Sequence, residues 1–365
     1  MATITAGSKV SRHVYVGTYT EPPSGKAEGI YTYRFDPDTG ALTLTQTVAG
    51  VANPSLLALD SSQRFLYAVN ELDDGRISAF ARDAQSGELR ALNSQSTHGA
   101  APCYVSLNSS GRYALVANYN GETVTALPIA EDGSIKPASS VVRHQGSSVN
   151  LRRQERPHPH MIASTPDGRF VLATDLGTDR VMVYRLDPVS GELVPNDAGP
   201  PFAPVEHGSG PRHFAFAPNG QTLYVINELS STLTVFDYDG GTGTLSPHQT
   251  VSTLPKDFAG QSWCAHVAVA PDGRFVYGSN RGHDSITIWA TDPALGEVTL
   301  VGHESTRGEA PRNFALDPTG FWLLAANQDS HTVVAFRRDP DSGTLAATRQ
   351  VTEVPSPVAV VFSRD

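Results

Sequence analysis

The sequence has very few cysteines. Only two of its 365 residues are of this type, Cys103 and Cys264, and no Cys-x-x-Cys pair is present. A disulfide framework needs an even set of more closely spaced cysteines, usually in a short secreted chain. We therefore expect no such framework here, with a single bridge between the two thiols as the less favoured alternative.

The chain also lacks a long apolar run and an excess of positive charge. No stretch approaches the length of a membrane-spanning helix, and the N-terminal segment MATITAGSKVSRHVYVGT has no apolar region of a secretory signal. The formal net charge of −10 argues against broad binding to nucleic acid or anionic membranes, which need a basic surface. We expect a cytoplasmic protein with neither partner, in which any anionic ligand meets a local cluster of cations.

What the sequence does contain is a repeat. Composition, with 39% hydrophobic and 18% charged residues, is that of a globular protein with a large core. A turn pattern with Asp shortly before Gly recurs seven times, as in FDPDTGAL, LDPVSGEL and RDPDSGTL, at intervals of 46 to 58 residues. Its glycines are Gly40, Gly87, Gly133, Gly191, Gly243, Gly296 and Gly343. Each follows a β-branched or alternating run, which predicts a hairpin whose glycine takes a positive φ.

A second hairpin lies in each interval, for example APCYVSLNSSGRYALVANY and GPRHFAFAPNGQTLYVINE. Six copies are contiguous, while the seventh is divided between SPVAVVFSRD at the C-terminus and HVYVGTYTE at residues 13–21. Pairing of the two chain ends in one sheet explains that division, because it leaves no open edge. We predict an all-β, seven-bladed propeller of four-stranded antiparallel blades, forming one domain over residues 1–365. Six-bladed and WD-type propellers are the alternatives, but the count is seven and no WD signature is present.

One interval is longer than the others. The excess between Gly133 and Gly191 lies in VVRHQGSSVNLRRQER, residues 141–156. A long loop in a compact repeat array is usually a functional lid or a flexible insertion. We leave both roles open for this loop.

Propeller geometry identifies which side chains meet at the central channel. The start of the first strand and the end of the second lie at the same mouth, close to the axis, so aligned hairpins give two columns. The first column reads Ser55, Cys103, His160, Arg212, Ala265, Arg312 and Val358. The second reads Tyr19, Glu71, Tyr119, Leu176, Glu228, Arg281 and Gln328. These columns predict a small cationic cavity with an imidazole and at least one carboxylate, suited to a bound carboxylate or phosphate.

A third column, just before the second, is mostly asparagine. It reads Thr18, Asn70, Asn118, Asp175, Asn227, Asn280 and Asn327. We interpret these side chains as turn caps that bond to the backbone. Oxygen atoms of Asn70, Asp175 and Asn227 are conceivable calcium ligands, but three arginines near the same axis repel a cation, so we expect no metal and no cofactor.

Several quoted segments resemble one family. VNLRRQERPHPHM, GPRHFAF with LYVINE, SNRGHDSI and PRNFALDPTGFWLLAANQ are similar to the seven-bladed lactonase family of 6-phosphogluconolactonases and 3-carboxy-cis,cis-muconate lactonizing enzymes. That resemblance implies a catalytic histidine, two arginines and a glutamate, which fall on His160, Arg212, Arg281 and Glu228. It also implies that residues of NLRRQE, Arg153 and Gln154, close over the site.

The expected chemistry is metal-independent opening of a sugar lactone, with 6-phosphogluconolactone the leading substrate. His160 is the expected general base, although Glu228 as base with His160 as acid stays open, and Arg212 and Arg281 stabilise the oxyanion. Arg312, helped by Arg153, is expected to bind the phosphate. His158 and Tyr119 are kept as further substrate contacts, although a structural histidine and a packing tyrosine are the plainer interpretations. Alternatives are a muconate-type cycloisomerase and a non-catalytic scaffold, and we expect a monomer.

Overall fold

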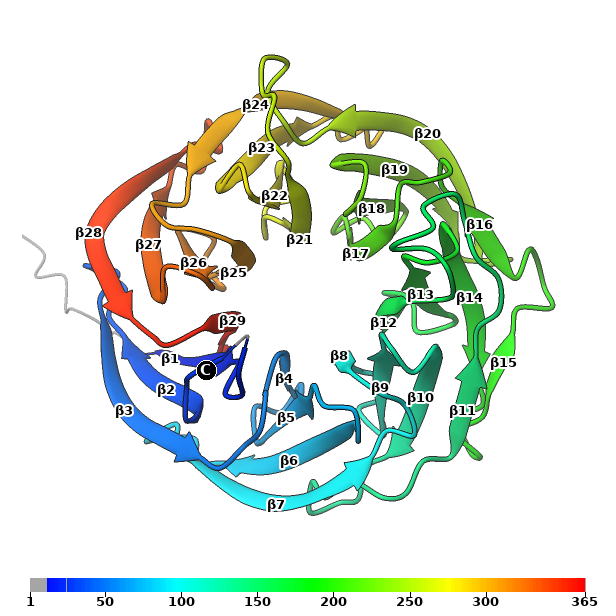
Figure 1. Ribbon diagram of the computed structural model, residues 1–365, viewed down its shortest axis with the longest axis horizontal. Coiled ribbons are helices and arrows are strands. Elements are labelled where there is room, and N and C mark those ends of the chain that lie inside the picture. Colours follow the sequence, from blue (N-terminus) through cyan, green and yellow to red (C-terminus); the bar gives the residue numbers. More distant parts are fainter. Residues whose placement is uncertain (1–11, 24, 365) are drawn as a thin grey trace, which may run out of the picture.

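The computed structural model describes residues 12–23 and 25–364, which form 29 β-strands and no helix. The strands make seven antiparallel sheets, A to G, arranged as blades around a central channel (Figure 1). Each blade has a path of four strands from the channel outward, and one blade carries an additional strand. The predicted seven-bladed propeller is confirmed.

The strands have the following bounds, given from the channel outward. Blade A comprises β29 (Pro357–Phe362), β1 (Arg12–Thr18), β2 (Gly29–Phe35) and β3 (Leu42–Ala49). Blade B comprises β4 (Leu57–Leu59), β5 (Phe65–Asn70), β6 (Arg76–Arg82) and β7 (Leu89–Ser96). Blade C comprises β8 (Pro102–Leu107), β9 (Tyr113–Asn118), β10 (Thr123–Pro128) and β11 (Ser140–Arg143). Blade D comprises β12 (Pro159–Ser164), β13 (Val171–Asp175), β14 (Arg180–Leu186) and β15 (Leu193–Pro195), and β16 (Phe202–Pro204) also pairs with β14.

The other three blades follow the same order. Blade E comprises β17 (Pro211–Phe216), β18 (Thr222–Asn227), β19 (Thr232–Asp239) and β20 (Thr244–Ser252). Blade F comprises β21 (Trp263–Val269), β22 (Phe275–Arg281), β23 (Ser285–Thr291) and β24 (Val298–Ser305). Blade G comprises β25 (Pro311–Leu316), β26 (Trp322–Asn327), β27 (Thr332–Arg338) and β28 (Leu345–Glu353).

The two ends of the chain close the ring. Strand β29 pairs antiparallel with β1, with Val14 opposite Phe362 and Val16 opposite Val360. In Figure 1 the red innermost strand β29 lies beside the blue β1. This pairing confirms the predicted division of one hairpin between the termini, and it leaves no sheet edge open at the seam.

Neighbouring blades are held together by apolar side chains. The described residues form seven hydrophobic clusters, and each cluster fills the space between two adjacent sheets, including the seam between blades G and A. At that seam, Phe35 packs edge-on against Trp322 with a ring-centroid distance of 5.9 Å. The second strand of each blade is buried on both faces over nearly its whole length, which explains its β-branched and aromatic composition.

The seven repeated glycines lie in the turn between the third and fourth strands of each blade, and all have positive φ, as predicted. In blade D the Asp187 carboxylate accepts hydrogen bonds from the amides of Val189 and Ser190, and Gly191 donates back to the Asp187 carbonyl. At Gly40, a Cβ atom would lie 2.3 Å from the Trp322 ring of blade G. The turn is therefore also a contact between blades, which requires glycine for space as well as for conformation.

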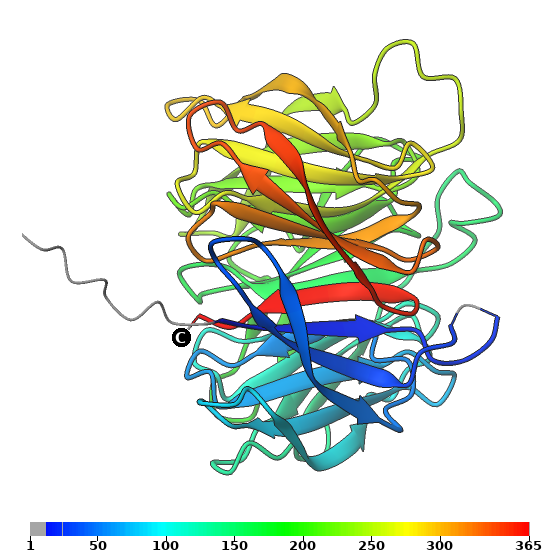
Figure 2. The ribbon, with the colours of Figure 1, turned by 90° about the vertical axis from the view of Figure 1, so that its left-hand side faces the viewer.

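One face of the ring carries the longest connections. Figure 2 shows loops projecting from the side opposite the C-terminus, including the teal connection from β11 to β12 and the yellow-green connection from β20 to β21. The first of these covers residues 144–158, here called the 144–158 loop. The prediction of a loop over residues 141–156 was wrong at its start, because 141–143 pair with β10 as part of β11.

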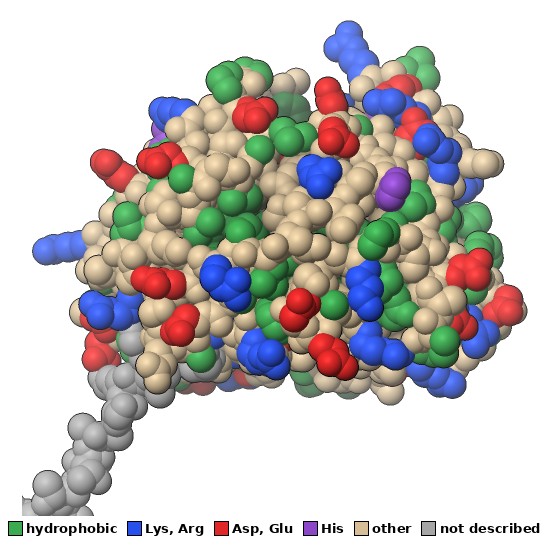
Figure 3. Space-filling model, turned by 90° about the horizontal axis from the view of Figure 1, so that it is seen from below, with side chains coloured by type: hydrophobic (Ala, Val, Ile, Leu, Met, Phe, Trp, Pro, Cys, Tyr) green, Lys and Arg blue, Asp and Glu red, His purple; other side chains and the backbone are tan. Residues whose placement is uncertain are grey.

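The structure tests some of the other expectations that were drawn from composition. Cys103 and Cys264 are both buried and free, so no disulfide links them. No helix in the described part of the chain is long and apolar enough to cross a membrane. Figure 3 shows one side of the ring, on which acidic and basic side chains are interspersed. Residues 1–11, on which much of the expectation about a secretory signal rests, lie outside the described residues.

Candidate active site

In several blades a β-bulge at the start of the first strand aims one residue at the channel. In blades C, D, E and G the pairing skips a residue directly after a proline, for example between Pro159 and Met161. Proline has no N–H to donate, so the ladder is interrupted there and the bulged residue is re-aimed. The skipped residues are Cys103, His160, Arg212 and Arg312, which are members of the first predicted column.

A cavity of about 370 Å³ lies at this mouth of the channel. Its lining residues come from blades B to G and from the 144–158 loop. They are Glu71, Cys103, Tyr119, Arg153, His160, Glu228, Trp263, Arg281 and Arg312. Six of the eight predicted site residues therefore meet in one space, while Arg212 and His158 lie outside its lining.

Glu228 is the centre of an ion-pair cluster. Its Oε1 lies 2.6 Å from Arg153 Nη2, and its Oε2 lies 2.8 Å from both Arg212 Nε and Arg281 Nη2. The carboxylate is 5% exposed, so these contacts are weakly screened. Burial alone would raise the pKa of Glu228, but Arg281, Arg212 and the other neighbouring cations hold it well below its usual value. Glu228 is therefore ionised and engaged, which makes it a weak base.

Arg212 lies beneath the cavity. Its side chain is 2% exposed, and its Nη1 donates to the Ala265 carbonyl of blade F. Burial and the charges of Arg281 and Arg312 lower the pKa of Arg212 to about 10, so it stays protonated at neutral pH. It lines only a small void of about 10 Å³ next to Glu71 and Cys103. Arg212 thus contacts Glu228, and its predicted contact with an oxyanion stays a prediction.

His160 is 4% exposed and borders the cavity. Its Nδ1 lies 3.6 Å from Cys103 Sγ, and within the described residues its Nε2 makes no hydrogen bond to protein. Burial, followed by the charges of Arg212 and Arg312, holds the pKa of His160 well below 6.5. The imidazole is therefore neutral at physiological pH and able to accept a proton.

His158 lies behind Tyr119. The two rings stack with centroids 4.4 Å apart, and His158 Nδ1 lies 3.1 Å from the Tyr119 carbonyl oxygen. The other nitrogen of His158 lies 3.3 Å from a Glu155 carboxylate oxygen. The plainer interpretation of His158, a structural histidine, therefore describes its contacts, and its expected contact with substrate is not seen in the cavity lining. Tyr119 itself lines the cavity and accepts a hydrogen bond from Arg153 at 3.2 Å.

Arg312 is the least engaged cation of the cavity. Its guanidinium carbon lies 5.5 Å from the centre of the Tyr19 ring. Among the residues that the structure describes, its side chain forms no hydrogen bond and no ion pair within 4 Å. Tyr19 in turn donates to Glu71 Oε2 at 3.0 Å. The Arg312 hydrogen-bond donors are thus free for a ligand.

Comparison with known proteins assigns the chain to a family. Residues 13–362 match the family model described as lactonase, 7-bladed beta-propeller. The chain belongs to this family. It is 38% identical over 349 residues to the 6-phosphogluconolactonase of Bacillus subtilis, covering 95% of this chain and 97% of the relative.

Two further relatives of this lactonase-family protein extend the similarity. The 6-phosphogluconolactonase of Formosa agariphila is 33% identical over 341 residues, covering 91% of this chain and 94% of the relative. The solved structure of the periplasmic gluconolactonase of Pseudomonas aeruginosa superposes with a TM-score of 0.90 at 37% identity, covering 97% of this chain and 99% of that one. The resemblance noted from sequence motifs is therefore confirmed.

Sequence reasoning missed one residue of the lactonase cavity entirely. Trp263 is 40% exposed and stands at the start of β21, after a connection with no counterpart in the repeat. The available signal was an aromatic residue two positions before the column member Ala265. Glu71 and Cys103 were in the columns but were not selected as site residues.

The asparagine column is structural. Asn118 Nδ2 bonds to the Thr97 carbonyl and to two threonine hydroxyls, and Asn280 Nδ2 contacts the Thr253 carbonyl in the same way. These side chains tie the second strand to the connection that enters the blade, which agrees with the turn-cap interpretation. Within the described ranges, no group of three or more His, Cys, Asp or Glu side chains is arranged to hold a metal ion.

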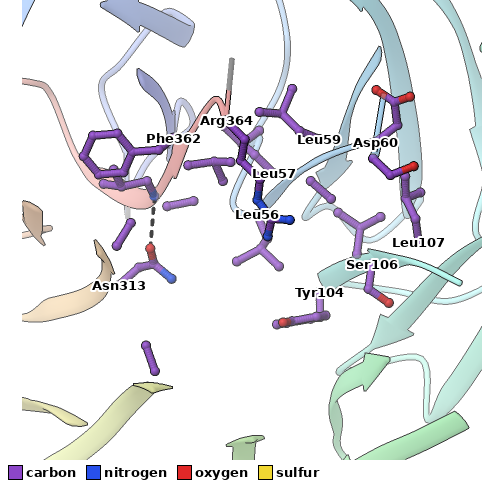
Figure 4. A pocket seen from close by; sticks show the side chains of 18 of the residues that line it. Leu56, Leu57, Leu59, Asp60, Tyr104, Ser106, Leu107, Asn313, Phe362 and Arg364 are labelled. Carbon is purple, nitrogen blue, oxygen red and sulfur yellow. Dashed lines mark hydrogen bonds between the residues drawn. The ribbon is translucent and has the colours of Figure 1, made fainter. Parts of the chain in front are cut away.

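The other end of the channel holds a larger cavity of about 530 Å³, shown in Figure 4. Its walls are mainly aliphatic, including Leu56, Leu59 and Leu107, and the charged side chains among its described lining residues are Asp60 and Arg364. It lacks the cluster of arginines found at the first mouth. We therefore assign the chemistry to the smaller cavity.

Proposed function

We propose that the protein hydrolyses 6-phosphoglucono-1,5-lactone to 6-phosphogluconate. The observation that carries this proposal is the charge balance of the site. Four guanidinium groups, of Arg153, Arg212, Arg281 and Arg312, face two carboxylates, of Glu71 and Glu228, beside a neutral imidazole. Two positive charges remain. A phosphate monoester carries about −1.5 to −2 charges at pH 7, whereas an unphosphorylated sugar lactone carries none.

Arg312 is the proposed phosphate ligand, because its donors are free and it lines the same cavity as Arg153 and Glu228. A charge-assisted hydrogen bond of this kind contributes about 1.5–3 kcal/mol. The cavity of about 370 Å³ is of the size that small-ligand pockets have. Trp263 offers an apolar face for the sugar ring at the open side.

His160 is the proposed general base. Its Nε2 is free, its imidazole is neutral, and the competing base Glu228 is occupied by three arginines. The alternative in which Glu228 abstracts the proton is therefore disfavoured. A positioned general base contributes about 10²–10⁴ in rate.

The reaction then follows from the placement of charge. His160 takes a proton from water as the hydroxide oxygen attacks the lactone carbonyl carbon, and negative charge develops on the carbonyl oxygen. Arg153 and Arg281, which both line the cavity, stabilise that charge. Collapse of the tetrahedral intermediate breaks the bond between the carbonyl carbon and the ring oxygen. The ring oxygen then receives the proton from His160. Arg212 lies beneath the cavity and forms an ion pair with Glu228. Glu228 in turn holds the guanidinium groups of Arg153 and Arg281 in position.

The test is hydrolysis of freshly generated 6-phosphoglucono-1,5-lactone, followed by NMR against its spontaneous rate. We expect the wild type to hydrolyse this lactone faster than the spontaneous rate, both before and after treatment with a chelator. Its activity on glucono-1,5-lactone is expected to be lower. His160→Ala is expected to return the rate to the spontaneous one. A wild type that opens neither lactone contradicts the proposal, and turnover of a carboxymuconate substrate would instead support the cycloisomerase.

Location and assembly belong to the same proposal. We propose a monomer in the cytoplasm; the pairing of β29 with β1, which closes the ring without a second chain, supports the monomer. Size-exclusion chromatography with light scattering and cell fractionation test the two statements.

A further inference from the structure

One buried carboxylate outside the cavity connects the segments that carry the site. Asp179 lies in the turn between β13 and β14 and is 1% exposed. Its Oδ1 accepts hydrogen bonds from Gln154 Nε2 and the Gly210 amide, both at 2.7 Å. Its Oδ2 accepts from the Ser148 hydroxyl and from the Gly208 amide. The donors therefore come from the 144–158 loop and from the connection that enters blade E.

Two of these contacts, those from Gln154 and Gly210, are one step from the Glu228 cluster. Gln154 follows Arg153, whose Nη2 bonds to Glu228 and to the Tyr119 hydroxyl. The Gly210 carbonyl accepts the backbone amide of Glu228 at 2.7 Å. A single carboxylate thus fixes the backbone on both sides of the Arg153–Glu228 ion pair.

The corresponding turns in other blades have at most part of this arrangement. In blade F, Asp284 Oδ1 accepts the Ala310 amide at 2.9 Å, as Asp179 accepts the Gly210 amide, but no bond from Asp284 to side chains like Ser148 and Gln154 is present among the described residues. Glu122 of blade C occupies the same turn position and has a similar backbone, with φ of 59° against 55° at Asp179. The Glu122 carboxylate pairs with Arg143 and Arg156, whose side chains are 63% and 45% exposed. The turn conformation and the bond to the next connection recur in the repeat, whereas the bonds to Ser148 and Gln154 of the 144–158 loop are particular to Asp179 among the described residues.

Arg153 needs such support. It comes from a loop without regular secondary structure, and an arginine side chain loses about 2 kcal/mol of rotamer entropy when it is fixed. Gln154 is fully buried, and besides Asp179 it donates to the Leu176 carbonyl at 2.9 Å and accepts from the Asn150 amide at 3.1 Å. These bonds order the loop before any ligand arrives.

We propose that Asp179 and Gln154 are positioning residues that hold Arg153 against Glu228 for the reaction. The inference rests on the proposed function for its catalytic consequence, and on the geometry alone for its effect on the loop. Neither residue lines the cavity, so both act through Arg153 and Glu228.

The main test is a double-mutant cycle on kcat/KM between Gln154→Met and Arg153→Ala. Methionine keeps the length of the side chain and removes its hydrogen bonds. We expect Gln154→Met to lower kcat/KM by about 10-fold or more, because small misplacements of a catalytic group reach about 100-fold. In the Arg153→Ala background the same change is expected to have almost no effect. Losses that multiply independently would overturn the proposal.

A second measurement does not depend on turnover. Amide hydrogen exchange in residues 148–156 is expected to accelerate at least tenfold in Asp179→Asn and in Gln154→Met, while exchange in the strands of blades A and B stays unchanged. Unchanged protection of the loop in both variants overturns the proposal even if the wild type opens no lactone. Gln154→Met carries the test if Asp179→Asn does not fold.

Asp317→Asn is the matched control. Asp317 is also 1% exposed, lies at the other end of its blade in the turn after β25, and accepts bonds from Arg12, Thr319 and Trp322. We expect it to lower thermal stability as Asp179→Asn does, with kcat/KM within twofold of the wild type. Equal losses of kcat/KM in the two variants would show that Asp179 is merely structural.

Discussion

Replacement of Glu228 by glutamine tests the electrostatic account of the site most directly. The substitution keeps the shape of the side chain and removes its charge. Three guanidinium groups, of Arg153, Arg212 and Arg281, then lose their shared carboxylate. The glutamine amide also points two N–H donors at groups that can only donate.

The loss of stability can be sized from burial. Arg212 is 2% exposed and keeps only backbone and histidine contacts once the carboxylate is gone. Removing one partner of a buried ion pair costs about 3–5 kcal/mol. We expect Glu228→Gln to lower the free energy of unfolding in urea by about that amount. Glu122→Gln, whose partner Arg143 is 63% exposed, is the control and is expected to lose about 1 kcal/mol or less.

The same substitution is expected to strengthen anion binding. The site gains one net positive charge, and two unit charges 4 Å apart interact by about 4 kcal/mol at an effective dielectric constant of 20. If about one third of this survives screening, the dissociation constant for inorganic phosphate falls about tenfold. Titration calorimetry measures it. A variant that is less active but as stable as the wild type, with unchanged phosphate affinity, would refute the role of the Glu228 ion pairs in setting the stability and charge of the site.

Three further predictions concern neighbouring groups. Arg312→Gln is expected to lower kcat/KM about 10- to 100-fold for the phosphorylated lactone and little for glucono-1,5-lactone, measured side by side. Because burial, Arg212 and Arg312 depress the pKa of His160, the acidic limb of kcat/KM is expected below pH 6.5 and moves to higher pH in Arg312→Gln. Burial lowers the pKa of His266 to about 3, so between pH 6.5 and 3 only the unfolded state binds that proton, and stability falls as pH falls. His266→Asn is expected to reduce this slope in urea unfolding by up to about 1.4 kcal/mol per pH unit.

The ring and most of the site could be predicted because both follow from repetition. Seven equivalent hairpins fix the blade count, and equivalent positions in those hairpins fix which residues reach the channel. His160 and Arg312 illustrate this, since each is the bulged residue after a strand-opening proline. Such a position can be counted along the sequence without knowledge of any contact.

Depth below the mouth could not be predicted in the same way. Arg212 occupies the same bulged position as His160, but its long side chain bends to the Ala265 carbonyl and to Glu228. His158 is turned aside by stacking on Tyr119. Trp263 begins β21 opposite Arg281, two positions before the column member Ala265, at a position that the two columns did not include. These outcomes depend on side-chain rotamers and loop paths, which tertiary contacts decide.

Closure of the ring is what completes the site. Arg312 enters from blade G, Tyr19 from blade A and Glu71 from blade B, so this wall of the cavity spans the seam where β29 pairs with β1. Arg153 comes from the loop between blades C and D, and Glu228 comes from blade E. Burying and gathering these guanidinium groups is unfavourable in itself, as is shown by the pKa of Arg212, which is lowered first by burial and then by the charges of Arg281 and Arg312. Sheet pairing and seven apolar interfaces supply the free energy that holds these groups together. The two positive charges that remain unpaired then favour an anionic substrate.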